Sequence, residues 1–179
     1  MSNEKLVFYW GPPGAGRAAS VATFVSKLEK PVTGDRDFSV NLGSRTATLY
    51  FSSFATKFYY DMAVPERPKG FEPVLQRLAK ASGVVFVVDS QEVRREANIG
   101  WLKRLRADLL LAGRSLDDLP IVFQLNKRDL PDVADVAELQ RELRTDWCAY
   151  VESIAPKRIG TSEAIDHLFR LIAEGPPRH

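Results

Sequence analysis

Four polar residues, Asn126-Lys127-Arg128-Asp129, directly follow the short apolar run Ile121–Leu125. Such a run, rich in β-branched residues, predicts a buried parallel strand. The carboxyl end of such a strand is where an open α/β sheet places its ligand contacts. The Asp129 carboxylate can accept from both N1–H and the exocyclic amine of guanine, a pair that adenine cannot donate. The Lys127 stem can cover the base, and Asn126 can tie the loop to neighbouring segments. These residues fit equally a plain strand-to-helix turn in which Asp129 starts a helix.

A glycine-containing loop, Gly11 to Gly16, lies between an expected strand (Lys5–Trp10) and an expected helix (Arg17–Lys30). In this arrangement the backbone N–H groups of the loop and of the helix amino end converge on an anion. The expected phosphate-binding residues are Gly14, Ala15, Gly16, Arg17, Ala18 and Ala19.

The loop departs from the phosphate-loop pattern G-x-x-x-x-G-K-[ST]. Gly11 and Gly16 match, but Arg17 replaces the lysine and Ala18 replaces the serine or threonine. Arg17 keeps the positive charge in a bulkier, forked form. Ala18 offers no hydroxyl to Mg²⁺. The alternative is a tight turn from which phosphate binding has been lost.

Length and composition indicate one globular domain over residues 1–179, with a core at about 5–174 and a tail at 175–179. The 25 basic and 23 acidic residues are too balanced to indicate nucleic-acid binding. The single cysteine, Cys148, excludes an internal disulfide and suits a reducing compartment. No apolar run approaches about 18 residues and no signal peptide is evident, so we expect a cytoplasmic protein without a membrane span. No metal-binding set is predicted.

Strand and helix patterns alternate along the chain, which predicts an α/β fold with a mostly parallel sheet and helices on both faces. The expected strands are Lys5–Trp10, Asp37–Val40 as a short edge strand, Arg45–Phe51, Val84–Val88, Ile121–Leu125 and Ala149–Ser153. The expected helices are Arg17–Lys30, Glu72–Ala81, Gln91–Leu111 (with Val93, Ala97, Trp101, Leu105 and Leu109 inward), Val133–Leu143 and Ser162–Glu174.

Three motifs follow one another along the chain, each at the end of an expected strand: the degenerate loop, Asn126–Asp129 and Glu152-Ser-Ile-Ala155. With them the chain resembles a Ras-type small GTPase, most closely the bacterial MglA-type proteins. The similarity is strongest over Gly83–Glu92, Leu119–Pro131 and Glu152–Pro156, and it extends from about Lys5 to Glu174. The resemblance implies a three-layer, P-loop NTPase-like fold (a Ras-type G domain) with a six-stranded sheet and five helices. It also implies a roadblock-type, MglB-like protein partner at the switch face. The implied guanine-binding residues are Asn126, Lys127, Asp129, Ser153, Ile154 and Ala155.

Two further departures concern the switch segments of this family. The first switch is shortened to roughly Ser39–Thr48, and the T-x-P-G-Q-like motif is matched to Ser53–Lys57, with Thr56 for the glycine and Lys57 for the glutamine. Hydrolysis needs Mg²⁺, the loop lysine and a placed water together. We therefore expect no hydrolysis, assign no catalytic residue, and expect Mg²⁺ to bind weakly or not at all.

The leading hypothesis is a pseudo-GTPase that binds GTP or GDP weakly or not at all and acts as a protein-interaction module. The alternative is a slow, partner-assisted GTPase in polarity or motility signalling. An ATP-dependent P-loop enzyme is disfavoured by the guanine motif. The aromatic side chains between Phe51 and Tyr60 either pack inward or form an apolar patch for a partner. The candidate switch and partner surface comprises Phe54, Lys57, Phe58, Tyr59 and Tyr60.

Overall fold

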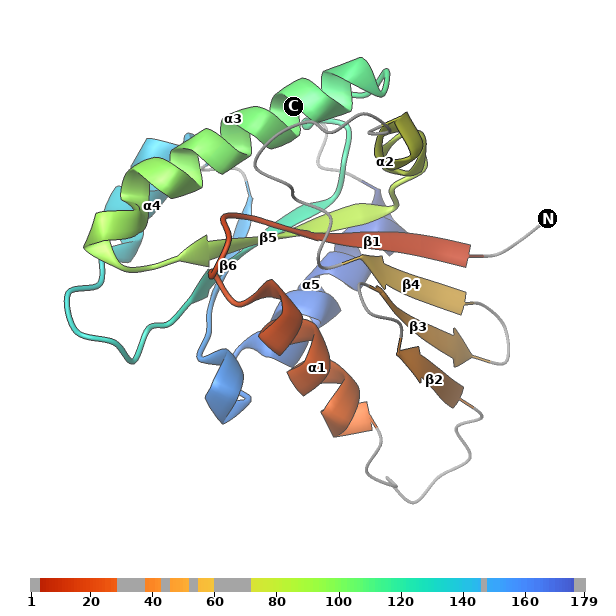
Figure 1. Ribbon diagram of the computed structural model, residues 1–179, viewed down its shortest axis with the longest axis horizontal. Helices are drawn as coiled ribbons and strands as arrows, with labels where there is room; N and C mark the ends of the chain where they lie inside the picture. The colour runs from red at the N-terminus through yellow and green to blue at the C-terminus, as the bar shows by residue number, and fades with distance from the viewer. Residues whose placement is uncertain are drawn as a thin grey trace.

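A single seven-stranded sheet forms the middle layer of the computed structural model, which describes residues 4–28, 38–42, 46–51, 55–59, 72–145 and 148–175. The strand order is β2-β3-β4-β1-β5-β6-β7 (Figure 1). The strands are β1 (Glu4–Trp10), β2 (Phe38–Leu42), β3 (Thr46–Phe51), β4 (Ala55–Tyr59), β5 (Gly83–Asp89), β6 (Ile121–Asn126) and β7 (Ala149–Glu152). The five strands from β4 to β7 in this order pair in parallel, and β3 is antiparallel to both of its neighbours.

The prediction of a six-stranded sheet is therefore wrong, and the strand that was not predicted is β4. Its side chains are buried on both faces of the sheet, because Phe58 packs into one core cluster and Tyr59 into the other. A strand that is buried on both faces lacks the alternation that identifies a half-exposed strand. The expected edge strand at Asp37–Val40 is confirmed as β2, shifted by one to two residues.

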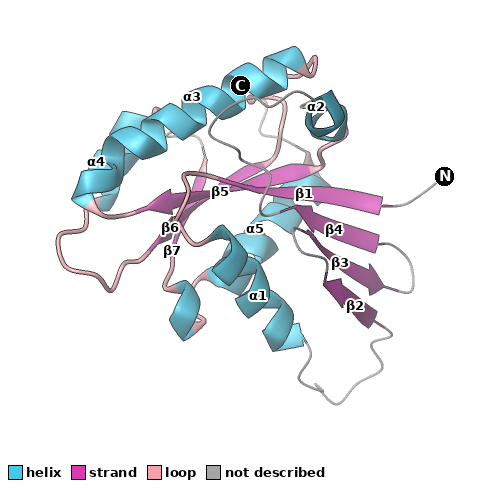
Figure 2. Ribbon diagram, in the orientation of Figure 1, coloured by secondary structure: helices cyan, strands magenta, loops and turns pink. Residues whose placement is uncertain are grey.

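Helices cover both faces of the sheet, as the strand and helix alternation predicts. The helices are α1 (Arg17–Leu28), α2 (Glu72–Leu78), α3 (Arg95–Leu111), α4 (Val136–Leu143) and α5 (Thr161–Glu174), with short 3-10 turns η1 (Glu92–Arg94) and η2 (Ala155–Lys157). Helices α1 and α5 lie on one face, and α2, α3 and α4 on the other (Figure 2). None of the helices in the described part of the chain is long and apolar enough to cross a membrane.

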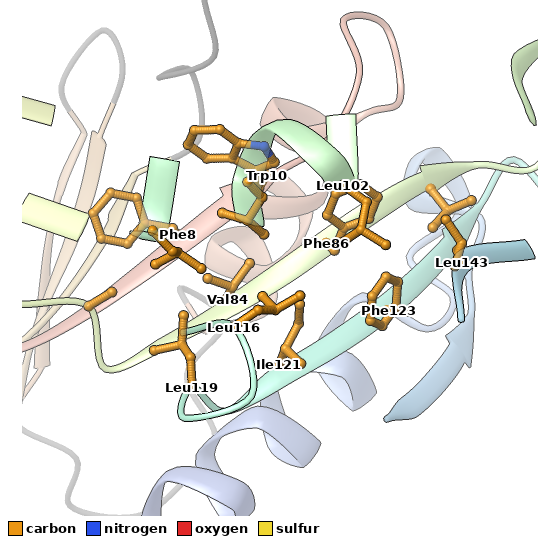
Figure 3. Close-up of a cluster of buried hydrophobic side chains, with 14 of the residues drawn as sticks. Phe8, Trp10, Val84, Phe86, Leu102, Leu116, Leu119, Ile121, Phe123 and Leu143 are labelled. Atoms are coloured by element: carbon orange, nitrogen blue, oxygen red, sulfur yellow. The ribbon is translucent and has the colours of Figure 1, made fainter. Parts of the chain in front are cut away.

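Among the residues that the structure describes, the core consists of two clusters, one on each face of the sheet. Consecutive residues of β5 belong alternately to one cluster and the other, and the strand is buried throughout. This explains its uninterrupted apolar sequence. Figure 3 shows the cluster under α3 and α4, where Phe86 and Phe123 of neighbouring strands contact Leu102 and Leu143 of the two helices. These buried strands form a rigid base for the loops at their carboxyl ends.

The long helix expected from Gln91 differs from prediction at its start. Residues Glu92–Arg94 form a 3-10 turn, and the α-helix begins at Arg95. A 3-10 turn advances each residue further around the axis than an α-helix does. The face that is inward in the helix is therefore not continuous with Val93, which is 87% exposed instead of buried.

Candidate nucleotide site

Asn126, the last residue of β6, connects the two candidate ligand loops. Its Nδ2 donates to the backbone oxygen of Ala15 at 2.8 Å. Its Oδ1 accepts from the backbone N–H of Ala155 at 3.0 Å and from the Ser153 hydroxyl at 3.1 Å. Asn126 is almost fully buried, so these bonds are shielded from water. The prediction that Asn126 ties its loop to neighbouring segments is confirmed.

A second buried side-chain amide, that of Gln124, lies two residues before Asn126 on β6. Gln124 Nε2 donates to the Ser20 hydroxyl at 2.8 Å and to the Ser153 hydroxyl at 3.0 Å. The Ser20 hydroxyl itself donates to the backbone oxygen of Gly16 at 2.9 Å. Because both its donor and an acceptor site are engaged, Ser20 does not replace the hydroxyl that Ala18 lacks.

Two glycines let the phosphate loop approach the sheet. Gly11 has φ +139°, and a Cβ there would lie 2.2 Å from the backbone oxygen of Val87. Gly16 has φ +102°, and a Cβ there would lie 2.3 Å from Asn126 Nδ2. Any side chain at Gly16 would therefore displace the amide that joins the two loops.

Backbone donors of the loop remain available for an anion. In the described part of the chain, the N–H groups of Gly14, Gly16, Ala18 and Ala19 make no hydrogen bond to protein groups. Gly14, Ala18 and Ala19 are exposed. The first turn of α1 contains no acidic residue. Unpaired N–H groups at a helix amino end attract negative charge, so the loop fits a phosphate group.

The Arg17 side chain, in contrast, contacts α3. Arg17 is only 8% exposed, and its guanidinium carbon lies 5.9 Å from the ring centroid of Trp101. Trp101 is held in place by Trp10, whose Nε1 donates to the Trp101 backbone oxygen at 3.3 Å and whose ring meets the Trp101 ring edge-on. Arg17 therefore begins α1 with its side chain buried against α3. In this conformation its charge lies against an indole.

The candidate guanine-binding residues lie in two adjacent loops, after β6 and after β7. The backbone N–H of Arg128 donates to the Ser153 oxygen at 3.3 Å, which joins the loops. Asp129 Oδ2 lies 2.9 Å from Lys157 Nζ. This ammonium group is the main cause of the lowered pKa of Asp129. The structure thus brings the predicted carboxylate to the expected edge of the sheet, but in an ion pair.

Asp89, the last residue of β5, was not predicted as a site residue. Its carboxylate is buried and lies 2.7 Å from Lys127 Nζ and 3.5 Å from Arg94 Nε. Arg94 also donates to the backbone oxygen of Pro13 at 2.8 Å. Asp89 therefore orients the lysine of the base loop and, through Arg94, contacts the phosphate loop. Its place at the carboxyl end of a central strand was the signal available in the sequence.

Lys57 does not occupy the catalytic place assigned to it. It lies inside β4 and pairs with Leu6, four residues before the end of β1 at Trp10. Four residues of strand span about 13 Å. The matching of Ser53–Lys57 to the T-x-P-G-Q-like motif is therefore wrong, because the phosphate loop lies at the other end of β1.

The other candidate switch residues also differ from expectation. Phe58 and Tyr59 are buried at 0% and 5% exposure, so they do not form an exposed partner surface. Phe54 and Tyr60 lie outside the described residues. The segment Ser39–Thr48, expected as a shortened switch, lies largely in the antiparallel strands β2 and β3.

The chain order indicates where a counterpart of the catalytic motif falls. A motif that reaches phosphates at the carboxyl edge must follow β4, which ends at Tyr59. The sequence there reads Ala63-Val-Pro-Glu-Arg67, which shares the proline and has Glu66 and Arg67 in place of glycine and glutamine. These residues lie outside the described part of the chain.

The mostly parallel sheet has a candidate phosphate-binding loop after its central strand β1 and a candidate guanine-binding motif after β6, two strands away, an arrangement that defines a small G-domain protein. No protein-family model matches the chain. The chain is 30% identical over 181 residues to the mutual gliding-motility protein MglA of Myxococcus xanthus (strain DK1622), covering 95% of this chain and 90% of that protein. The chain therefore belongs to the MglA family of Ras-like small G-domain proteins.

Proposed function

We propose that this protein is a pseudo-GTPase: a G-domain protein that binds guanine nucleotide weakly, does not hydrolyse GTP, and acts as a protein-interaction module. The observation that carries this proposal is the contrast between the two ends of the site. Asn126 and its partners hold the base end in place, whereas the phosphate end lacks a hydroxyl and has its arginine on Trp101.

At the base end, the geometry supports guanine recognition. The buried bonds of Asn126 fix the loop of Lys127 and Asp129 beside the loop of Ser153 and Ala155. Lys127 Nζ is held by the Asp89 carboxylate at 2.7 Å. A carboxylate on such a loop distinguishes guanine from adenine, because only guanine presents two adjacent donors.

At the phosphate end, less charge is available to offset a nucleotide. Bound Mg²⁺ would bridge phosphate oxygens and neutralise their charge. Ala18 has no oxygen for it, the Ser20 hydroxyl is engaged, and the described residues contain no cluster of three His, Cys, Asp or Glu side chains. The backbone N–H groups of the loop and Arg17 are the groups that would contact phosphate. Affinity that rests on them is expected to be low and largely independent of metal.

The proposal includes a protein partner and a cellular setting. The relative of this chain is described as a gliding-motility protein. We extend to this chain a role in motility or polarity signalling in the cytoplasm, with a roadblock-type, MglB-like protein as partner at the switch face. An interaction role of this kind depends on a stable surface and can be carried out without turnover.

The test is a set of nucleotide measurements on the purified full chain. Nucleotide released by denaturation is analysed by mass, and a fluorescent GDP analogue is titrated with Mg²⁺ and with EDTA, in competition with GTP and ATP. We expect guanine selectivity, little effect of EDTA, and no GTP turnover. Equal competition by ATP and GTP would contradict the proposed base recognition. Mg²⁺-dependent turnover at the rate of ordinary small GTPases would favour the slow, partner-assisted GTPase instead.

A further inference from the structure

Lys157 lies beside Asp129, the carboxylate that the proposed function assigns to guanine. Its Nζ is 2.9 Å from Asp129 Oδ2, across the gap between the loop after β6 and the loop after β7. Guanine recognition would require both carboxylate oxygens of Asp129 to face the base edge. An ammonium group on one of them competes for the same lone pairs.

Hydrogen bonds fix the backbone of the loop that carries Lys157, which holds this residue opposite Asp129. The N–H of Lys157 donates to the backbone oxygen of Ile154 at 2.9 Å, closing the turn η2. Ala155, the first residue of η2, donates its backbone N–H to Asn126 Oδ1, and its backbone oxygen accepts from the Thr23 hydroxyl of α1 at 3.0 Å. The backbone of Lys157 is thereby anchored to both β6 and α1.

The loop that carries Asp129 is fixed as well. Arg128 Nε lies 2.8 Å from Glu152 Oε2, and its NH1 donates to the Ala134 oxygen at 2.7 Å. With both backbones anchored, the two side chains stay within reach of each other, and only side-chain freedom is lost when Lys157 and Asp129 meet. Side-chain entropy is the usual reason that exposed ion pairs are weak.

We propose that Lys157 lowers the affinity and selectivity for guanine nucleotide by competing with the base for Asp129. This inference rests on the proposed guanine binding and adds its regulation: the affinity is set by a contact within the chain. Because the side chain of Lys157 is 59% exposed, the pair is screened by salt. High ionic strength would therefore relieve the competition.

The test compares Lys157→Met with the wild type by titration of fluorescent GDP and ADP analogues at low and high salt. Methionine keeps the length and apolar stem but removes the charge. We expect about a two- to five-fold gain in affinity for the GDP analogue at low salt, no gain for the ADP analogue, and a smaller difference at high salt. Arg158→Asn is the matched control, since it removes one positive charge from the same turn, suits the left-handed backbone there, and leaves the pair intact.

The outcomes separate this inference from the proposed function. Guanine-selective binding by the wild type that is unchanged or weakened in Lys157→Met would overturn the competition alone. Absence of guanine selectivity in both proteins would overturn the proposed function and the competition with it. An NMR titration of the Asp129 carboxyl reports the contact without nucleotide: its pKa should rise in Lys157→Met, and an unchanged pKa would also overturn the competition.

Discussion

The base end and the phosphate end of the candidate site meet at Asn126, yet they differ in what holds them. At the base end, buried side-chain hydrogen bonds connect loops that are far apart in the chain. At the phosphate end, exposed backbone N–H groups remain and the guanidinium of Arg17 contacts a ring on another element. The base end is held by contacts within the protein. At the phosphate end, binding depends on whether the ligand attracts the Arg17 guanidinium away from Trp101.

This difference suggests why the two ends depart from the family pattern to different degrees. Asn126 stabilises the fold in addition to any bound ligand. Its replacement would therefore lower the stability even of a protein that binds no nucleotide. A loop lysine or a metal-binding hydroxyl contributes to the ligand alone. The side chains that distinguish a binding site from an ordinary turn can therefore be lost at Arg17 and Ala18 while the loops keep their shape.

The largest effect is expected from Asn126→Ala. Three hydrogen bonds are lost, and the buried Ala15 oxygen and Ala155 N–H lose their Asn126 partner, so the free energy of unfolding should fall by about 3 kcal/mol. Urea unfolding measures this change, with Gln76→Ala on the exposed face of α2 as the control that leaves stability unchanged. An Asn126→Ala protein as stable as the wild type would show that the two ends are not coupled through this residue.

The next effect concerns Arg17→Ala. A forked contact of Arg17 with phosphate makes two charge-assisted hydrogen bonds of about 1.5–3 kcal/mol each, together more than the roughly 2 kcal/mol of a desolvated cation–π contact. Nucleotide is thus expected to draw the guanidinium from Trp101, and Arg17→Ala should weaken GDP binding by about 1–2 kcal/mol.

The same titration gives an optical check on Arg17. Indole fluorescence should change on GDP binding in the wild type and change less in Arg17→Ala. Lys103→Ala, on the exposed side of α3, is the control for a lost positive charge. Equal affinity of wild type and Arg17→Ala would mean that the arginine stays on Trp101 and takes no part in binding.

A smaller effect is expected when the metal ligand is restored. In Ala18→Thr the new hydroxyl lies at the position of the pattern that contacts Mg²⁺. GDP affinity should become higher with Mg²⁺ than with EDTA by about three- to ten-fold, roughly 0.7–1.4 kcal/mol. The wild type should differ by less than about two-fold under the same conditions. Strong loss of binding by the wild type in EDTA would contradict the role given to Ala18.

The smallest effect is the response to pH. The pKa of Asp129 lies below its ordinary value of 3.8, chiefly because of the Lys157 ammonium group. A depressed carboxyl pKa means that the charge, and any stability it contributes, persists as pH falls and is lost only below that ordinary value. Guanine selectivity should therefore be constant from about pH 7.5 to pH 5. A decline near pH 6 would point to another titrating group.

The sequence was sufficient for features that depend on local pattern. The buried strands β1, β5 and β6 each show an apolar run, and the residues at their carboxyl ends lie at one edge of the sheet because parallel strands end together. Asn126 was interpreted correctly for this reason. The pattern failed at β4, where Phe58 and Tyr59 pack on opposite faces and remove the alternation.

Contacts between distant side chains could not be predicted in the same way. Nothing in the local sequence places the Arg17 guanidinium on Trp101, which lies 84 residues later in the numbering, or Lys157 beside Asp129. Both depend on the relative placement of elements that the fold brings together. The role of Asp89 could have been predicted from the sequence, because Asp89 directly follows the most strand-like segment in the chain.

The bond between Asn126 and Ala15 joins residues 111 positions apart, and the bond between Arg94 and Pro13 joins residues 81 apart. Contacts of this kind require distant parts of the chain to be brought together, so they exist only in the folded sheet. A nucleotide would then recognise only the completely folded chain. By mass action, ligand at 100 times its Kd would stabilise that state by about 2.7 kcal/mol. Even without catalysis, binding could thereby set how much of the chain is present in folded form.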